Sequence, residues 1–191
     1  MSFMVLNNFF DKFIFTSQLK FKDYNFFVLD IPFVIVPVDM LQGFSAMDVP
    51  EVNKAVYYAF KSSTQSLLIP KFKAGATKPK FLELSQAFFA ASGWGLMHNV
   101  EVDEVNHRAI VTLSYSPIAR SLQGKVHHPV DHYTRAVIAA VFSEYFETPV
   151  EAVESECLAL HPGDCSFVIK PLNEFDFTKE ETQRQLSLDA P

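Results

Sequence analysis

The sequence predicts an α+β domain in which a largely antiparallel sheet packs against helices. Short runs of alternating polar and apolar residues, typical of half-buried strands, occur in the middle of the chain and near its C-terminal end. Three longer runs instead repeat apolar residues at helical spacing. The chain has 191 residues, 49% of them hydrophobic, which is enough apolar material for one core of ordinary size.

The first half of the chain predicts strands followed by two helices. Residues 12–38 are rich in Phe, Ile and Val and are interrupted by turn residues, so they predict two or three strands. A helix is predicted over 48–68, with Asp48 as its N-cap and Pro50 in its first turn. A second helix is predicted over 80–93, where a glycine ends it.

The second half predicts two strand pairs on either side of a third helix. Residues 98–116 alternate polar and apolar side chains around a turn and predict a hairpin. The third helix lies within 130–149, and Asp131 suits its N-cap. Its middle is apolar on all sides, so we expect it in a core or a subunit interface. A last pair is predicted over 150–172, and the polar tail 176–191 is expected to be mobile or a short exposed helix.

Composition argues against several classes of protein. The net charge is -6, which disfavours a nucleic-acid-binding protein. The first residues lack the basic start and cleavage site of a signal peptide. The most apolar run, FFVLDIPFVIVPV, has 13 residues and is too short to span a bilayer. We therefore expect a cytoplasmic protein without a membrane span, whose cysteines are metal-bound or free rather than bridged.

Both cysteines lie in the stretch ESECLALHPGDCSF, residues 154–167. In an ideal hairpin turning at its Pro-Gly pair, the Cα atoms of Cys157 and Cys165 are roughly 10 Å apart. That spacing excludes a disulfide, which needs about 4.4–6.8 Å. A shared metal requires residues 158–164 to curl, and a bulge to turn Glu154 toward the thiols. The alternatives are a metal site, or two buried thiols beside a surface glutamate.

The same stretch resembles the signature that closes the vinyl-4-reductase-type domains, also called 4-vinyl reductase or hydrocarbon-binding domains. The matching residues are, in order, Glu154, Cys157, Gly163, Asp164, Cys165 and Phe167. A GWG at 93–95 and the stretch VTLSYSPIA at 111–119, which resembles the family's strand with a Ser-x-x-Ala-type end, agree with it. The resemblance is strongest over residues 80–170.

The resemblance implies a single ligand-binding domain over residues 1–175, with a fold of the NO-signalling and Golgi-transport ligand-binding type. Such domains are typically dimeric and are related in fold to the core subunits of the TRAPP tethering complex. They bind small apolar molecules in an internal pocket. In phenol-sensing members, a glutamate and three cysteines hold a structural zinc.

For this chain, the resemblance implies three of those zinc ligands, Glu154, Cys157 and Cys165. The fourth, a cysteine at the start of the preceding helix, is absent, and gap-free counting reaches Asp131, beside His132. Either side chain has a donor that zinc accepts, while Asp131 is equally suited to capping the helix. A zinc at this position is expected to be structural, tying the end strands to the third helix.

No nucleophile–base pair is evident, so a non-catalytic binding module, a sensor or carrier of apolar, aromatic or lipid-like molecules, is the first functional hypothesis. Its candidate lining, which plain core packing also explains, is Phe88, Phe89, Trp94, Phe142 and Tyr145. The second hypothesis is a homodimeric scaffold whose third helix is the dimer face. The third, a tetrapyrrole vinyl reductase, rests on the family name alone. A sensor of this kind is expected to signal through an effector protein partner.

Overall fold

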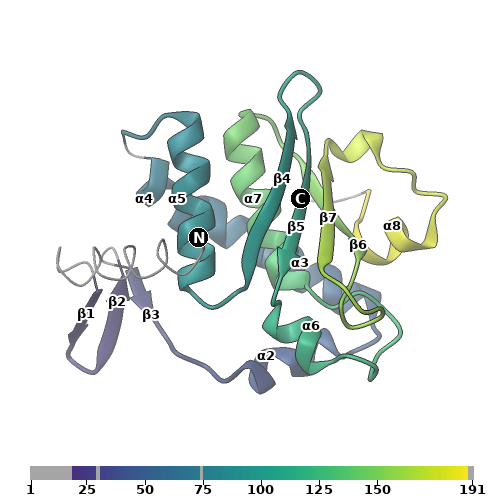
Figure 1. The fold of residues 1–191 in the computed structure, drawn as a ribbon, viewed down its shortest axis with the longest axis horizontal. Coiled ribbons are helices and arrows are strands. Elements are labelled where there is room, and N and C mark those ends of the chain that lie inside the picture. The colour runs from purple at the N-terminus through teal and green to yellow at the C-terminus, as the bar shows by residue number, and fades with distance from the viewer. Residues whose placement is uncertain (1–18, 29–30, 74, 189–191) are drawn as a thin grey trace.

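The computed structural model of the protein describes residues 19–28, 31–73 and 75–188, and it has the predicted α+β fold (Figure 1). In chain order, the elements are β1 (Leu19–Lys22), β2 (Asn25–Val28), β3 (Ile31–Phe33), α2 (Val38–Ser45), α3 (Pro50–Ser63), a π-helical turn (Thr64–Leu68), α4 (Ile69–Lys73), α5 (Lys78–Ala91), β4 (Leu96–Asp103), β5 (Arg108–Ser114), α6 (Pro117–Ser121), α7 (His132–Phe146), β6 (Glu151–Glu156), β7 (Cys165–Lys170), a 3-10 turn (Leu172–Glu174) and α8 (Glu180–Gln185).

The main sheet is antiparallel throughout, with the strand order β4-β5-β7-β6. Alternate residues of its central strands face the helices, so Val111 and Leu113 of β5 and Phe167 and Ile169 of β7 are fully buried. Helix α7 packs on β6 and β7, while α3 and α5 pack on α7 (Figure 1). One sheet face thus carries the core.

Helix α7 lies inside this core. Nearly all of its residues are buried, including Ala136, Ala139 and Ala140, which have no exposed surface. Small side chains let α3 approach it closely, and these two helices form the most extensive helix–helix contact of the described chain. Of the two environments expected for this helix, a core or a subunit interface, the structure shows the core, and the chain itself covers the face that the scaffold hypothesis assigned to a dimer contact.

The helix starts differ in part from those predicted. The N-cap of α3 is Val49, and Asp48 instead pairs with Arg184 of α8. Asp131 does occupy the N-cap position of α7, but its side chain makes no capping hydrogen bond. Its carboxylate is directed to other partners, described below.

The β6–β7 pair departs from an ideal hairpin by a longer loop between the strands and by one bulged residue. Glu154 lies opposite Phe167 and Glu156 opposite Ser166, so Ser155 forms a bulge. In an ideal hairpin that turns at the Pro-Gly pair, Cys157 would lie opposite Val168, but Val153 takes that place. The segment after Cys157 curls tightly, because the carbonyl of Cys157 accepts hydrogen bonds from the backbone N–H groups of Leu160 and His161, each at 3.0 Å.

The C-terminal segment packs against the domain, contrary to the expected exposed tail. Its helix α8 contacts α3 and β6, and Thr182, Gln185 and Leu186 are buried. Residues 189–191 lie outside the described residues, as do residues 12–18 of the predicted N-terminal strands.

The N-terminal strands form a separate antiparallel sheet, β1-β2-β3, which lies apart from the main sheet (Figure 1). Its clearest link to the core is Phe33, whose ring lies 6.0 Å from that of Phe88. Several large apolar side chains of this arm and of the segment after it are exposed: Phe21, Tyr24, Val34, Ile35, Met40 and Phe44. None of the helices in the described part of the chain has the length and apolar character of a membrane span.

Candidate metal centre and internal cavity

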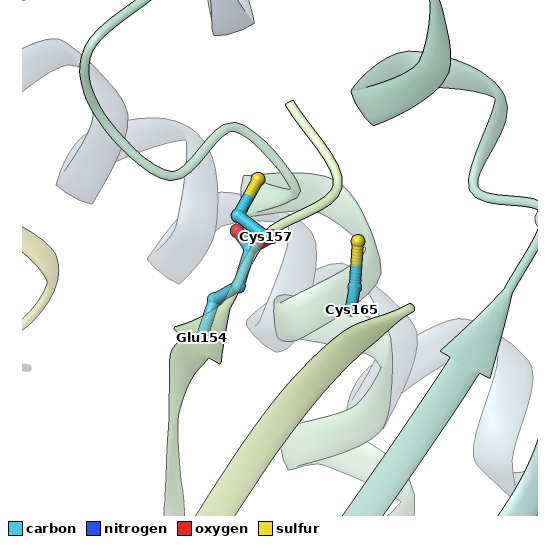
Figure 2. A group of neighbouring side chains, drawn as sticks. All are labelled: Glu154, Cys157 and Cys165. Carbon is cyan, nitrogen blue, oxygen red and sulfur yellow. The ribbon is translucent and has the colours of Figure 1, made fainter. Parts of the chain in front are cut away.

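Glu154, Cys157 and Cys165 meet where β6 ends and β7 begins. Their ligand atoms all lie within 4.8 Å of one another, and the exposed fractions of the residues are 1%, 3% and 0%. Figure 2 shows the two sulfur atoms projecting beyond the strand ends, with the Glu154 carboxylate beside Cys157. The bulge and the curl that a metal site requires of this stretch are both present.

Asp131 adjoins this cluster from the start of α7. Its backbone N–H donates to Oε2 of Glu154 at 2.9 Å, and its Oδ1 accepts a hydrogen bond from Ser116 Oγ at 2.7 Å. Its carboxylate also lies within hydrogen-bonding reach of the Cys165 thiol. Burial raises the pKa of Asp131 from 3.8 to about 6. The helix start therefore brings a second buried carboxylate to the site.

Two oxygen atoms of these carboxylates have no hydrogen-bond partner within the described residues, Oδ2 of Asp131 and Oε1 of Glu154. A buried polar atom without a partner is costly, by about 1–3 kcal/mol and more for a charged group. Burial, and then the charge of Asp131, raise the pKa of Glu154 well above its ordinary value. A cation at this point would satisfy both oxygens and remove the repulsion between the two acids.

The two thiols are also coupled, through a hydrogen bond between them. A hydrogen bond from the Cys165 thiol lowers the pKa of Cys157 to about 7, and that hydrogen bond together with burial raises the pKa of Cys165. Two thiolates and two carboxylates are donors that Zn²⁺ accepts in a tetrahedral site. The buried Glu-Cys-Cys group can hold a metal, and Asp131, which is not among the ligand atoms within 4.8 Å, lies next to it.

His132 lies outside the group of ligand atoms that meet within 4.8 Å. Its ring stacks on that of His128 with a centroid separation of 6.4 Å, and neither ring nitrogen of His132 has a hydrogen-bond partner in the described chain. Burial, and then the charge of Arg135, lower its pKa well below the ordinary value, so the ring is neutral at pH 7.

Sequence reasoning missed two residues that position the acidic ligands. Ser116 donates to Asp131 and caps α6 by accepting from the N–H of Ala119 at 3.2 Å, which gives the Ser-x-x-Ala element a structural role. Gln185 of α8 pairs with the backbone of Glu154, accepting from its N–H at 2.9 Å and donating to its C=O at 3.0 Å. The Ser-x-x-Ala motif could have pointed to Ser116, whereas no feature of the tail sequence pointed to Gln185.

An internal cavity of about 50 Å³ lies between α4, α5 and α7. Its lining consists of Leu68, Ile69, Phe72, Ser85, Phe88, Phe89, Trp94, Val137 and Val141. Three of the predicted lining residues are thus brought together here. The other two lie elsewhere: Phe142 packs with Phe146, and the hydroxyl of Tyr145 donates to Glu104 Oε1 at 2.6 Å.

No family model matches the chain, and the curated proteins include no significant match. Among solved structures, the crystal structure of the phenol-responsive sensory domain of the transcription activator PoxR with phenol superposes with a TM-score of 0.71. The two sequences are 14% identical, and the match covers 96% of each chain. The chain shares the fold of this sensory domain. At this identity the likeness concerns the fold, and membership of the 4-vinyl reductase family stays a prediction.

Proposed function

We propose that the protein binds a small aromatic or apolar molecule in its interior without turning it over, as a sensor or carrier domain. The observation that carries the proposal is the aromatic-lined cavity between α4, α5 and α7. It lies within a fold shared with a sensory domain crystallised with phenol. Mostly apolar walls with few polar groups are typical of small-molecule sites.

The polar groups of this cavity favour a ring with a single hydroxyl. Only the hydroxyl of Ser85 and the indole N–H of Trp94 interrupt the apolar lining. Ser85 already donates to the carbonyl of Phe81 at 2.9 Å, which leaves its oxygen free to accept a hydrogen bond from a ligand. A phenol-like molecule can use both groups, as donor to Ser85 and as acceptor from Trp94.

Ligand entry requires the cavity to widen. A cavity of about 150 Å³ is known to hold benzene, whereas this one measures about 50 Å³. Leu68, Ile69 and Phe72 form one wall, at the junction of the π-helical turn with α4. Single π-helical turns are local irregularities that often occur at functional sites. We expect this wall to move outward when a ring enters.

The experiment uses Trp94, the only tryptophan of the chain, as its reporter. Phenol titrated into the protein should change Trp94 emission saturably. Val141→Phe fills the cavity and should weaken binding about tenfold or more, equivalent to about 1.4 kcal/mol. Val105→Phe makes the same change at a site that is 87% exposed and should leave the affinity unchanged. Equal affinity of wild type and a folded Val141→Phe variant would contradict the proposal.

We also propose that a structural zinc, held by Glu154, Cys157, Cys165 and Asp131, stabilises the domain. The supporting observation is that two buried carboxylate oxygens near the two thiols have no hydrogen-bond partner in the described part of the chain. Bound zinc would join β6 and β7 to α7, so its removal should lower the melting temperature. Elemental analysis should give one zinc per chain for the wild type and much less for Cys165→Ser. Equal zinc contents would refute it.

The exposed arm favours a homodimer in addition. Val34 and Ile35 are 82% and 75% exposed in a stretch that also carries Met40 and Phe44. Contiguous apolar surface of this kind marks protein–protein contact. Light scattering should show a dimer for the wild type and a monomer for Ile35→Asp, whereas Val105→Asp should stay dimeric. A wild-type monomer at all concentrations would exclude this proposal and the scaffold alternative.

A further inference from the structure

The two cysteines are direct cross-strand neighbours in the bulged pairing. The last paired residues are Glu156 and Ser166, and the next position on each strand is a cysteine, Cys157 and Cys165. Opposite Cα atoms of antiparallel strands are about 4.5–5.5 Å apart. A disulfide needs about 4.4–6.8 Å between Cα atoms. Continuing the bulged register by one position places the two cysteines opposite each other, at a spacing that suits a disulfide and that an ideal hairpin would not give.

The side chains satisfy the second requirement. The two sulfur atoms lie within 4.8 Å of each other and end on the same side of the strands (Figure 2). The N–H of Leu158 donates to the sulfur of Cys165 at 3.4 Å, so the chain after Cys157 already folds back over its partner. Rotation about the Cα–Cβ bonds, without a change of strand register, can bring the sulfurs to bonding distance.

We infer that Cys157 and Cys165 are a modification site, at which a peroxide converts the two thiols into a reversible intramolecular disulfide. One sulfur, as its thiolate, attacks a peroxide oxygen and breaks the O–O bond, leaving a sulfenic acid and releasing water after protonation. The second thiol displaces the hydroxyl of that sulfenic acid as another water. The two thiols lose two electrons and two protons in total, and hydrogen peroxide takes up both.

Access to the sulfurs selects a small oxidant. Both cysteines are buried, with 3% and 0% of their surface exposed. The loop between the cysteines is exposed at residues 161–164, and it contacts the rest of the domain through the 2.9 Å His98–Asp164 contact and the hydrogen bond from the His161 N–H to the Cys157 carbonyl. Displacement of this short loop admits peroxide, whereas a bulky disulfide such as oxidised glutathione meets the strand ends and α7.

The disulfide and the metal are mutually exclusive uses of the same sulfurs. A metal needs both thiolates, and a disulfide removes them. The oxidation goes beyond the proposed function, since it depends only on the geometry of the two thiols and is expected in the metal-free chain whether or not the protein binds zinc or a phenol.

The test oxidises metal-free, full-length protein with stoichiometric hydrogen peroxide, then denatures it, alkylates free thiols and measures the intact mass. The wild type should lose both alkylation sites and become lighter by two hydrogens, and dithiothreitol should restore both sites. Cys157→Ser and Cys165→Ser should each gain oxygen or stay alkylatable. Two alkylated cysteines in treated wild type, oxygen added to it, or disulfide-linked dimers would overturn the inference. Zinc content is measured separately, so a failure of the metal proposal is distinguishable.

Discussion

Gln185 is expected to be the residue of the C-terminal segment whose loss destabilises the domain most, although its side chain is uncharged and its hydrogen bonds go to the backbone of Glu154. Its side chain makes two hydrogen bonds to the backbone of Glu154, at 2.9 Å and 3.0 Å, and the residue is 2% exposed. Gln185→Ala leaves a buried N–H and a buried C=O without partners. Each such group costs about 1–3 kcal/mol, so the free energy of unfolding should fall by about 2–6 kcal/mol.

Chemical denaturation measures this change, and Gln183→Ala is the matched control. Gln183 lies on the same helix and is exposed, with one side-chain hydrogen bond to the carbonyl of Phe177 at 2.6 Å. Its removal should cost no more than about 0.5 kcal/mol. Zinc affinity is a second readout, because partners that orient a ligand typically account for about 10–100-fold of metal affinity.

The two outcomes that would refute this reasoning are specific. A loss for Gln185→Ala as small as that for Gln183→Ala would mean that the backbone of Glu154 finds other partners. An unchanged zinc affinity, together with a large loss of stability, would mean that Gln185 supports β6 without positioning the Glu154 carboxylate.

Three further predictions concern the core and the acidic site. In the wild type, the Glu151 carboxylate lies 2.6 Å from Lys61 Nζ, so Lys61→Met leaves this carboxylate buried without its cation. Urea denaturation should show a loss of about 3–5 kcal/mol in the free energy of unfolding, and a second change, Glu151→Gln, should restore part of it. Gly95→Ala should cost more than about 1 kcal/mol, because Gly95 has φ +115° and a Cβ there would lie 2.8 Å from the Ser114 carbonyl, whereas Gly93→Ala, with open space around it, should cost less. In the metal-free protein, burial raises the pKa of Asp131 from 3.8 to about 6, so its stabilising contribution is complete below about pH 4 and is lost as the pH rises through about 6. The difference in free energy of unfolding between wild type and Asp131→Asn should therefore change by up to about 3 kcal/mol over that range. A difference that does not depend on pH would contradict the burial of this carboxylate.

Periodicity predicted the three long helices α3, α5 and α7 and the strand pairs of the main sheet, because their apolar faces are set by local spacing, but it did not predict the short helices α2, α4 and α6. The register of the last strand pair could not be predicted in the same way. One extra residue, Ser155, moves every following side chain of β6 by one position relative to β7. Nothing in ESECLALHPGDCSF marks that residue as a bulge, or marks the connection between the strands as longer than a tight Pro-Gly turn. The distance between the cysteines therefore could not be estimated from an ideal hairpin.

The cavity residues show a second limit. Phe88, Phe89 and Trp94 lie close together in sequence at the end of α5, and they do line one cavity. Phe142 and Tyr145 belong to α7, which is apolar all round, so its sequence carries no information about which neighbour each face meets. The prediction of an exposed or mobile tail was wrong for a related reason, because Gln185 is buried through a hydrogen bond to β6, a strand far away in the sequence.

The sequence allows Asp131 to be either a helix cap or a metal ligand, and its hydrogen bonds in the structure favour the second role. A capping carboxylate accepts from the first backbone N–H groups of its own helix, and Asp131 makes no such bond. Instead Ser116 Oγ donates to Oδ1, the N–H of Asp131 donates to Glu154, and Oδ2 has no hydrogen-bond partner among the described residues. Two charged carboxylates buried side by side, each with an oxygen that lacks a hydrogen-bond partner among the described residues, are unfavourable for folding unless protonation or a cation neutralises them. The arrangement therefore supports the proposed metal site better than it supports capping.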